Sequence, residues 1–163
     1  MRGYVLSLRT KKDTFQYHCI EGRPKTEFLQ KFVGLNQRLF LFNESKDDME
    51  KRFEEQKTIL GCYTFVCDLL IAFKIGFENE PYVFESWRGG VAKEYRGQGI
   101  ATQLMKLQHQ WCKTNHFRKI ITVTNADNTA MMSLNIKHGF KIVQHTTNHR
   151  NIQKVHFQKD LQQ

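Results

Sequence analysis

Residues 91–101 read VAKEYRGQGIA and join a predicted β-strand, at 82–91, to a predicted helix that begins at Ile100. Glycines at the start of a helix let successive backbone N–H groups converge on one anion, because no side chain blocks its approach. The helix N-terminus adds a partial positive charge, and Arg96 adds a permanent one at the rim. This segment therefore predicts a binding site for a pyrophosphate group.

Two familiar phosphate-binding motifs do not fit this segment. A P-loop requires Lys followed by Ser or Thr after its last glycine, whereas Ile100 follows Gly99. A dinucleotide-binding motif requires a third glycine where Thr102 stands, and an acidic residue about twenty positions later. The chain has no acidic residue from Tyr95 through Ala126. A glycine-rich turn without any ligand is the remaining alternative.

The rest of the chain predicts a mixed α/β fold. Apolar periodicity and turn residues indicate strands at 14–20, 58–65, 69–77, 82–91, 119–124, 140–145 and 152–157. Helices are expected after Pro24, at 45–56 with Ser45 as N-cap, from Ile100 to Trp111, and at 126–138. These elements predict a central mixed β-sheet flanked by about four helices. We expect one domain over residues 1–163, with residues 1–12 as an extra strand or a loose arm.

Positive charge is concentrated in the second half of the chain. Residues 1–94 carry 15 basic and 14 acidic side chains, whereas residues 95–163 carry 10 basic and two acidic ones. Such asymmetry points to an anionic partner, which is a polyphosphate cofactor, nucleic acid or an acidic membrane surface. No apolar run approaches the roughly 18–20 residues that span a bilayer, and the first ten residues do not resemble a secretory signal. A cytoplasmic protein without a membrane partner is therefore expected.

The cysteine and histidine residues do not indicate a metal site. The close pair of cysteines lacks the CxxC spacing of zinc and redox sites, and we expect buried or half-buried thiols at Cys19, Cys62, Cys67 and Cys112. His145 and His149 stand four residues apart and are interpreted as solvated or substrate-facing side chains. No metal is predicted.

Two motifs flank the predicted helix that begins at Ile100. Arg96, Gly99 and Ala101 match the pattern Arg/Gln-x-x-Gly-x-Gly/Ala. A second pattern, Asn-x-x-Ala-x-x-Leu-Tyr-x-x-x-Gly-Phe, has the same spacing as Asn128, Met131, Leu134, Gly139 and Phe140. Both motifs, and the order of predicted elements over residues 15–160, resemble the GNAT superfamily of N-acetyltransferases. Two positions depart from that family, because Met131 replaces an alanine and Asn135 replaces a tyrosine that protonates the departing thiolate in many members.

The resemblance implies acetyl-CoA as the cofactor, with its pyrophosphate on the N–H groups that follow Arg96. Its pantetheine arm would pair with the backbone of residues 89–91, where the sheet is expected to splay apart and two glycines suit a bulge or a close ligand. Asn128 and Asn135, two helical turns apart, would face the cofactor, unless Asn128 only serves the helix N-terminus and Asn135 is solvated. The expected cofactor-binding residues are Gly90, Val91, Arg96, Gly97, Gln98, Gly99, Ile100, Ala101, Thr102 and Asn128.

Acetyl transfer to an amine also requires a base. A primary amine has a pKa near 10.4, so forming its neutral state at pH 7 costs roughly 4.6 kcal/mol of free energy. Glu85 is the predicted base: it lies six residues before Val91, the offset at which the resemblance places the base of the histone-modifying branch of the family. Its aromatic neighbours would raise its pKa. A surface carboxylate paired with Arg88 is the alternative, and Glu78 and Glu80 are further candidates. Asn135 or a water molecule would hydrogen-bond the departing sulfur, and a backbone N–H near Val91 would bind the oxyanion.

The sequence does not identify the acceptor. By analogy with the fold, Trp87 and the segment 144–149, with His145, are expected to border the acceptor pocket. A small-molecule or protein amine is the expected acceptor, and a homodimer is considered because family members often pair. One rival function is a basic module that binds nucleic acid or an acidic protein, although Trp111 is expected in the core. Another is an acyltransferase that uses a different acyl-CoA or a hydroxyl acceptor.

Overall fold

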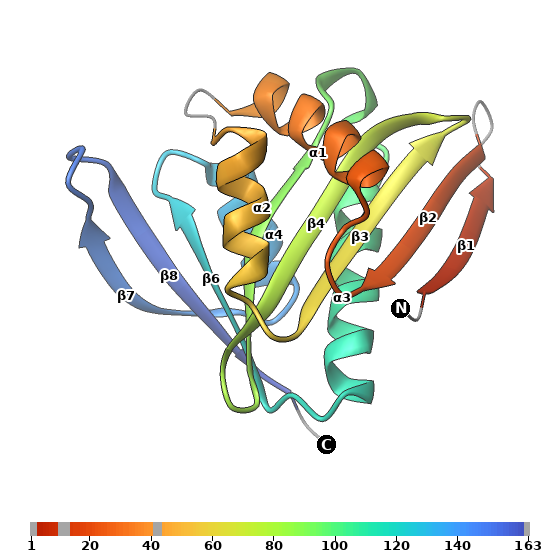
Figure 1. The fold of residues 1–163 in the computed structure, drawn as a ribbon. Coiled ribbons are helices and arrows are strands. Elements are labelled where there is room, and N and C mark those ends of the chain that lie inside the picture. The colour runs from red at the N-terminus through yellow and green to blue at the C-terminus, as the bar shows by residue number, and fades with distance from the viewer. Residues whose placement is uncertain (1–2, 10–13, 41–43, 162–163) are drawn as a thin grey trace.

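In this computed structural model, which describes residues 3–9, 14–40 and 44–161, the chain forms an eight-stranded mixed β-sheet (Figure 1). The strands lie in the order β1-β2-β3-β4-β5-β6-β8-β7. Among the strands of the described residues, only β5 and β6 pair in parallel. The strands are β1 Gly3–Arg9, β2 Thr14–Glu21, β3 Ile59–Val66, β4 Leu69–Glu80, β5 Val83–Val91, β6 Lys119–Asn125, β7 Lys141–Thr147 and β8 Gln153–Asp160.

The predicted mixed sheet is thus confirmed. Of the two alternatives for residues 1–12, an extra strand or a loose arm, β1 is the extra strand. It pairs antiparallel with β2 from Gly3 to Arg9. The other residues of the predicted N-terminal segment, 1–2 and 10–12, lie outside the described residues.

Helices cover both faces of the sheet. Within the described ranges they are α1 Thr26–Leu39, α2 Lys46–Glu54, α3 Ile100–Thr114, α4 Thr129–Lys137 and a short 3₁₀ helix, η1 Lys93–Tyr95, which the sequence did not predict. In Figure 1, α1 and α2 lie in front of the sheet and α3 and α4 lie behind it. None of the helices in the described part of the chain is long and apolar enough to cross a membrane.

A hydrophobic layer lies on each face of the sheet. Under α1 and α2, Phe32 is fully buried and its ring centre lies 4.7 Å from that of Phe73 on β4. On the other face, the ring of Phe84 on β5 lies 5.5 Å from that of Trp111 on α3. Trp111 is 5% exposed, which confirms that it is a core residue and leaves it unavailable for stacking on a nucleic acid base.

The cysteines only partly match the prediction. Cys19, Cys62 and Cys112 are buried, as expected, and none of the four cysteines, all of which lie in the described ranges, forms a disulfide. Cys67 is exposed in the turn between β3 and β4, so the prediction of a buried or half-buried thiol is wrong there. The turn places Cys67 at a φ of +50°, in the left-handed region of the backbone.

A β-bulge in β5 sets the position of the residues that follow. Phe77 pairs with Glu85 and Ile75 pairs with Arg88, so two residues of β5 lie opposite Gly76. A Cβ atom at Gly76 would overlap the carbonyl oxygen of Glu85, and glycine is therefore required there. Of the two alternatives for residues 89–90, the bulge is excluded, because both glycines pair regularly with β4, and the close approach of a ligand stays a prediction. A Cβ atom at Gly90 would instead lie 2.6 Å from the side chain of Leu39 at the end of α1.

The expected splaying of the sheet is confirmed. β5 and β6 pair only between Val83–Glu85 and Lys119–Ile121, although both strands continue. Just beyond the last pair, the Thr122 hydroxyl donates a hydrogen bond to the carbonyl oxygen of Ser86 at 2.8 Å. The edge of β5 that faces β6 therefore has no strand partner from Trp87 to Val91 within the described residues.

Candidate active site

The turn before α3 has the conformation that the glycines predicted. Gly97 and Gly99 have φ values of +75° and +78°, a region that glycine adopts without strain. Gly99 is the N-cap of α3 and provides no side-chain cap, and the first turn of the helix holds no acidic residue. The first N–H groups of α3 are consequently available to a ligand. A Cβ atom at either glycine would meet nothing within 4 Å, so the space above the turn is open.

Arg96 connects this turn to the end of β5. Its Nε donates a hydrogen bond to the carbonyl oxygen of Val91 at 3.0 Å, and the side chain is exposed. Within the described part of the chain its other guanidinium N–H groups have no partner. The residues present therefore fit a diphosphate on the α3 N-terminus, attached to an extended arm along the open edge of β5.

Asn128 sits at the start of α4, where it caps the helix. Its Oδ1 accepts a hydrogen bond from the backbone N–H of Met131 at 3.1 Å, which is the helix-capping alternative that the sequence left open. The side chain is exposed, so the amide nitrogen is available to a ligand. Its contact with a cofactor stays a prediction.

The structure excludes the alternative that the Asn135 side chain is solvated. The side chain is fully buried rather than solvated, and its Nδ2 donates a hydrogen bond to the Thr124 hydroxyl of β6 at 3.2 Å. Its Oδ1 has no partner among the residues that the structure describes. The predicted hydrogen bond to the departing sulfur would use the second N–H of the Asn135 amide. This contact stays a prediction.

Glu85 lies beside the bulge on the face of the sheet that α2 covers. The side chain is half-buried, and this burial raises its pKa above the ordinary value, whereas the positive charge of Arg52 lowers it. Glu85 is not paired with Arg88, whose Nη1 lies 3.1 Å from Glu44 instead. A half-buried carboxyl with a raised pKa suits proton transfer near neutral pH.

The other candidate bases have environments that suit them less. Both carboxylate oxygens of Glu78 accept hydrogen bonds, one from the Thr58 hydroxyl at 2.9 Å and one from the Tyr82 N–H at 3.4 Å. Glu80 is exposed at the far end of β4. Neither carboxylate lies at the bulge opposite Gly76 or at the open edge of β5, although a second shift in register lies between Glu78 and Glu80.

Trp87 lies in the same region as Glu85, whereas His145 does not. The Trp87 ring packs against Phe53 of α2 and Phe77 of β4 at 6.1 and 5.9 Å. His145 is exposed on β7, and β6 and β8 lie between β7 and β5. Three strand spacings of about 4.8 Å place β7 about 14 Å from β5. The structure therefore does not bring these two predicted acceptor residues together.

Sequence reasoning missed several polar residues beside Trp87. The guanidinium groups of Arg52 and Arg88 lie 5.0 and 4.4 Å from the centre of the Trp87 ring, and both contact Glu44. Arg88 was considered only as a partner of Glu85. The charged character of the 45–56 helix was the one signal in the sequence, and it gave no indication of which charges face the sheet.

Comparisons with known proteins agree with this geometry. The model of the acetyltransferase (GNAT) family matches residues 29–140. The ribosomal-protein-S18-alanine N-acetyltransferase from Escherichia coli is 15% identical, with a TM-score of 0.77 over 89% of this chain and 95% of that chain. Ard1 from Thermoplasma volcanium is 11% identical, with a TM-score of 0.75 over 89% and 99%.

A third similar structure contains a ligand. The PaiA N-acetyltransferase from Thermoplasma acidophilum, in complex with coenzyme A, is 15% identical to this chain, with a TM-score of 0.68 over 88% and 99% of the two chains. At these identities the likeness shows the fold. No curated protein matches the sequence.

Proposed function

Because the chain belongs to the GNAT acetyltransferase family, we propose that it transfers the acetyl group of acetyl-CoA to a primary amine. One observation carries this proposal. The open turn of Gly97 and Gly99 at the N-terminus of α3 lies next to the unpaired edge of β5. A diphosphate that continues into an extended amide-containing arm has the chemistry that both features would bind.

Each part of the site has a role in the proposed reaction. The N–H groups from Gly97 to Thr102, with the guanidinium of Arg96, hold the diphosphate, and the edge of β5 up to Val91 pairs with the pantetheine amides. When bound, acetyl-CoA supplies an acyl group activated as a thioester. A backbone N–H near Val91 donates to the acyl oxygen as negative charge develops there.

Glu85 is the proposed general base, acting directly or through a water molecule. Neutralising a primary amine at pH 7 costs roughly 4.6 kcal/mol, so a carboxylate that accepts the proton removes a large part of the barrier. Burial keeps the pKa of Glu85 above its ordinary value and makes the carboxylate a better proton acceptor. The departing thiolate has a pKa near 8.5 if it resembles cysteine, and it needs little protonation. Asn135 is therefore proposed as a hydrogen-bond donor to the sulfur and not as an acid.

Thermal unfolding with and without acetyl-CoA tests the cofactor site. At 100 times its dissociation constant, acetyl-CoA should stabilise the protein by about 2.7 kcal/mol. Gly99→Ala should abolish this stabilisation, because a side chain at positive φ strains the turn by about 1–2 kcal/mol and displaces its N–H groups. Gly22→Ala is the matched control, since Gly22 also has a positive φ of +86° and open space around it, but lies at the end of β2.

The outcomes separate the proposed enzyme from a binding module. We expect Gly22→Ala to lose stability while keeping the full effect of acetyl-CoA. An unchanged melting temperature of the wild-type protein, together with tight binding of DNA at moderate salt, would refute the proposal. A screen of amine acceptors that follows release of the free thiol then tests the reaction itself.

A further inference from the structure

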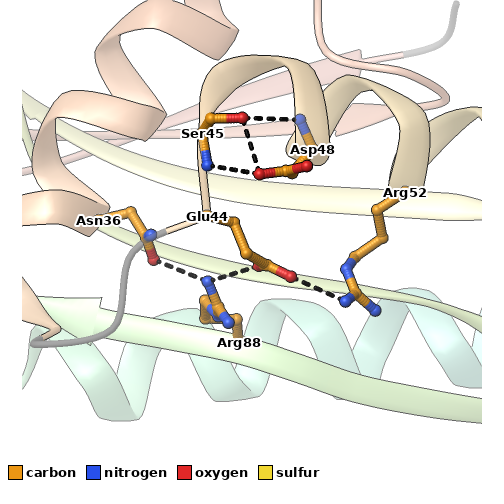
Figure 2. A network of polar contacts seen from close by, with 6 residues as sticks. All are labelled: Asn36, Glu44, Ser45, Asp48, Arg52 and Arg88. Carbon is orange, nitrogen blue, oxygen red and sulfur yellow. Dashed lines mark hydrogen bonds and ion pairs between the residues drawn. The ribbon is translucent and has the colours of Figure 1, made fainter.

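A polar network beside Trp87 is not used by the proposed chemistry. Figure 2 shows the carboxylate of Glu44 between the guanidinium groups of Arg52 and Arg88. Its Oε1 lies 2.8 Å from Arg52 Nη2, and its Oε2 lies 3.1 Å from Arg88 Nη1. Both guanidinium groups also stack on the ring of Trp87. Two cations therefore share one carboxylate on the face of the sheet that carries Glu85.

Two buried donors in this network have no acceptor. Asn36 of α1 is fully buried, and its Oδ1 accepts a hydrogen bond from Arg88 Nη1 at 3.3 Å, as Figure 2 shows. Its Nδ2 has no partner among the described residues, and the same holds for the buried Nε of Arg52. Glu44 Oε2 also has no hydrogen bond among the described residues, but it is ion-paired with Arg88 at 3.1 Å. Buried donors without acceptors cost free energy, so the two donors suit a further group that accepts hydrogen bonds.

The neighbouring acidic residues do not supply that group. Asp48 is engaged with Ser45 at the start of α2, where its Oδ2 accepts from the Ser45 hydroxyl at 2.7 Å and from the Ser45 N–H at 3.1 Å (Figure 2). Glu85 is nearby, but among the described residues it forms no ion pair or hydrogen bond with either arginine. Within the described part of the chain, Glu44 is therefore the one carboxylate in contact with both guanidinium groups.

Resting on the proposed acetyl transfer, we propose that Arg52 and Arg88 bind a carboxylate of the acceptor, which is a small amino acid. The planar guanidinium group matches the geometry of a carboxylate, and a carboxylate accepts hydrogen bonds without donating any. Arg88 lies three residues beyond Glu85 on β5, which is at most about 10 Å along the strand. A small molecule with both an amine and a carboxylate spans this distance between the base and the two arginines.

Glu44 positions the two arginines in this arrangement. Its two ion pairs hold both guanidinium groups beside the Trp87 ring. The acceptor carboxylate then binds the donors that Glu44 does not use. The ion pairs remain partly accessible, because the Arg52, Arg88 and Glu44 side chains are 41%, 21% and 26% exposed.

Matched pairs of acceptors test the proposal. Free α-amino acids are compared with their amides, which keep the amine and lose the negative charge, and kcat/KM is corrected for the fraction of neutral amine. We expect the free acids to be better substrates by about 10- to 100-fold, mainly through KM, as a charge-assisted hydrogen bond implies. Arg88→Gln and Arg52→Gln should each remove most of this preference, because kcat/KM for the free acids should fall by a larger factor than kcat/KM for the amides.

Two further variants guard against a merely structural effect. Arg38→Gln removes an exposed arginine from the last turn of α1 and should leave the preference for free acids intact. Arg88→Lys keeps the charge but loses the planar fork, and should restore part of the preference. Equal use of acids and amides by the wild-type protein, or equal losses for both in Arg88→Gln, would overturn the carboxylate site.

A binding measurement separates this proposal from the proposed function. Calorimetric titration of the protein with the same acids and amides, with and without coenzyme A, does not depend on turnover. Binding of acids over amides without any thiol release would support the carboxylate site and refute acetyl transfer. Binding of neither, in a protein that acetyl-CoA stabilises, would refute the carboxylate site alone.

Discussion

Gly76→Ala should displace the bulge of β5 and, with it, the carboxylate of Glu85. A Cβ atom at position 76 would overlap the carbonyl oxygen of Glu85 and the ring of Phe84. Neither can yield easily, because the first is backbone and the second is fully buried. Overpacking of this kind costs about 1–3 kcal/mol, which is the fall we expect in the free energy of unfolding. A shift of about 1 Å in Glu85 should also lower kcat/KM for an amine about 100-fold.

Urea unfolding at pH 7 and thiol release measure the two effects separately. Gly34→Ala is the control, because Gly34 is exposed in the middle of α1 and an added Cβ atom meets nothing within 4 Å. Alanine is favoured over glycine in a helix, so this variant should gain about 0.5–1 kcal/mol and keep its activity. If Gly76→Ala unfolds at the same urea concentration as the wild type and reacts at the same rate, the bulge does not position the base.

Two further predictions follow from buried ionisable groups. Glu85→Gln should keep the stabilisation by acetyl-CoA but lower the rate, and in a pH–rate profile the loss should shrink towards pH 10, where the solvent supplies neutral amine. Equal losses at pH 7 and pH 10 would remove Glu85 from the role of base. Burial lowers the pKa of Lys74 to about 8, so the unfolded chain binds more protons between about pH 8 and pH 10.4 and stability should rise with pH across this window. Lys74→Met should stabilise the protein at pH 7 by about 1–3 kcal/mol in urea unfolding and flatten this dependence, and lower stability would contradict the assignment.

The parts of the site that depend on local backbone rules could be predicted from the sequence. Gly97 and Gly99 have positive φ values because a strand must turn into the first turn of α3 within a few residues, and glycine marks such positions. Ser45 caps α2 because its hydroxyl accepts from the N–H of Asp48, a contact between residues three positions apart. In both cases the interacting groups are close in sequence, so the pattern of residue types is sufficient.

The parts that depend on distant residues could not be predicted. A bulge at the two glycines of β5 was one of two alternatives, but the bulge lies opposite Gly76, and its position depends on the pairing of Glu85 with Phe77 across a hairpin. Glu44 and Arg88 are separated by more than forty residues, and their ion pair exists only because α1 and α2 pack on the sheet beside β5. Asn135 shows the same limit, since its burial depends on the closeness of Thr124 on β6.

The structure also changes the interpretation of the basic second half of the chain. Lys113 lies in the last turn of α3, about 20 Å along the helix from Gly99, and is too far away to contact a diphosphate there. Lys137 lies in the last turn of α4, and Lys159 donates to the carbonyl oxygen of His138, which caps that helix, at 2.6 Å. Cations at helix C-termini are stabilised by the helix dipole and by the free carbonyl groups. Three of the ten basic side chains in residues 95–163 therefore lie at helix ends, and their charge does not by itself point to a nucleic-acid partner.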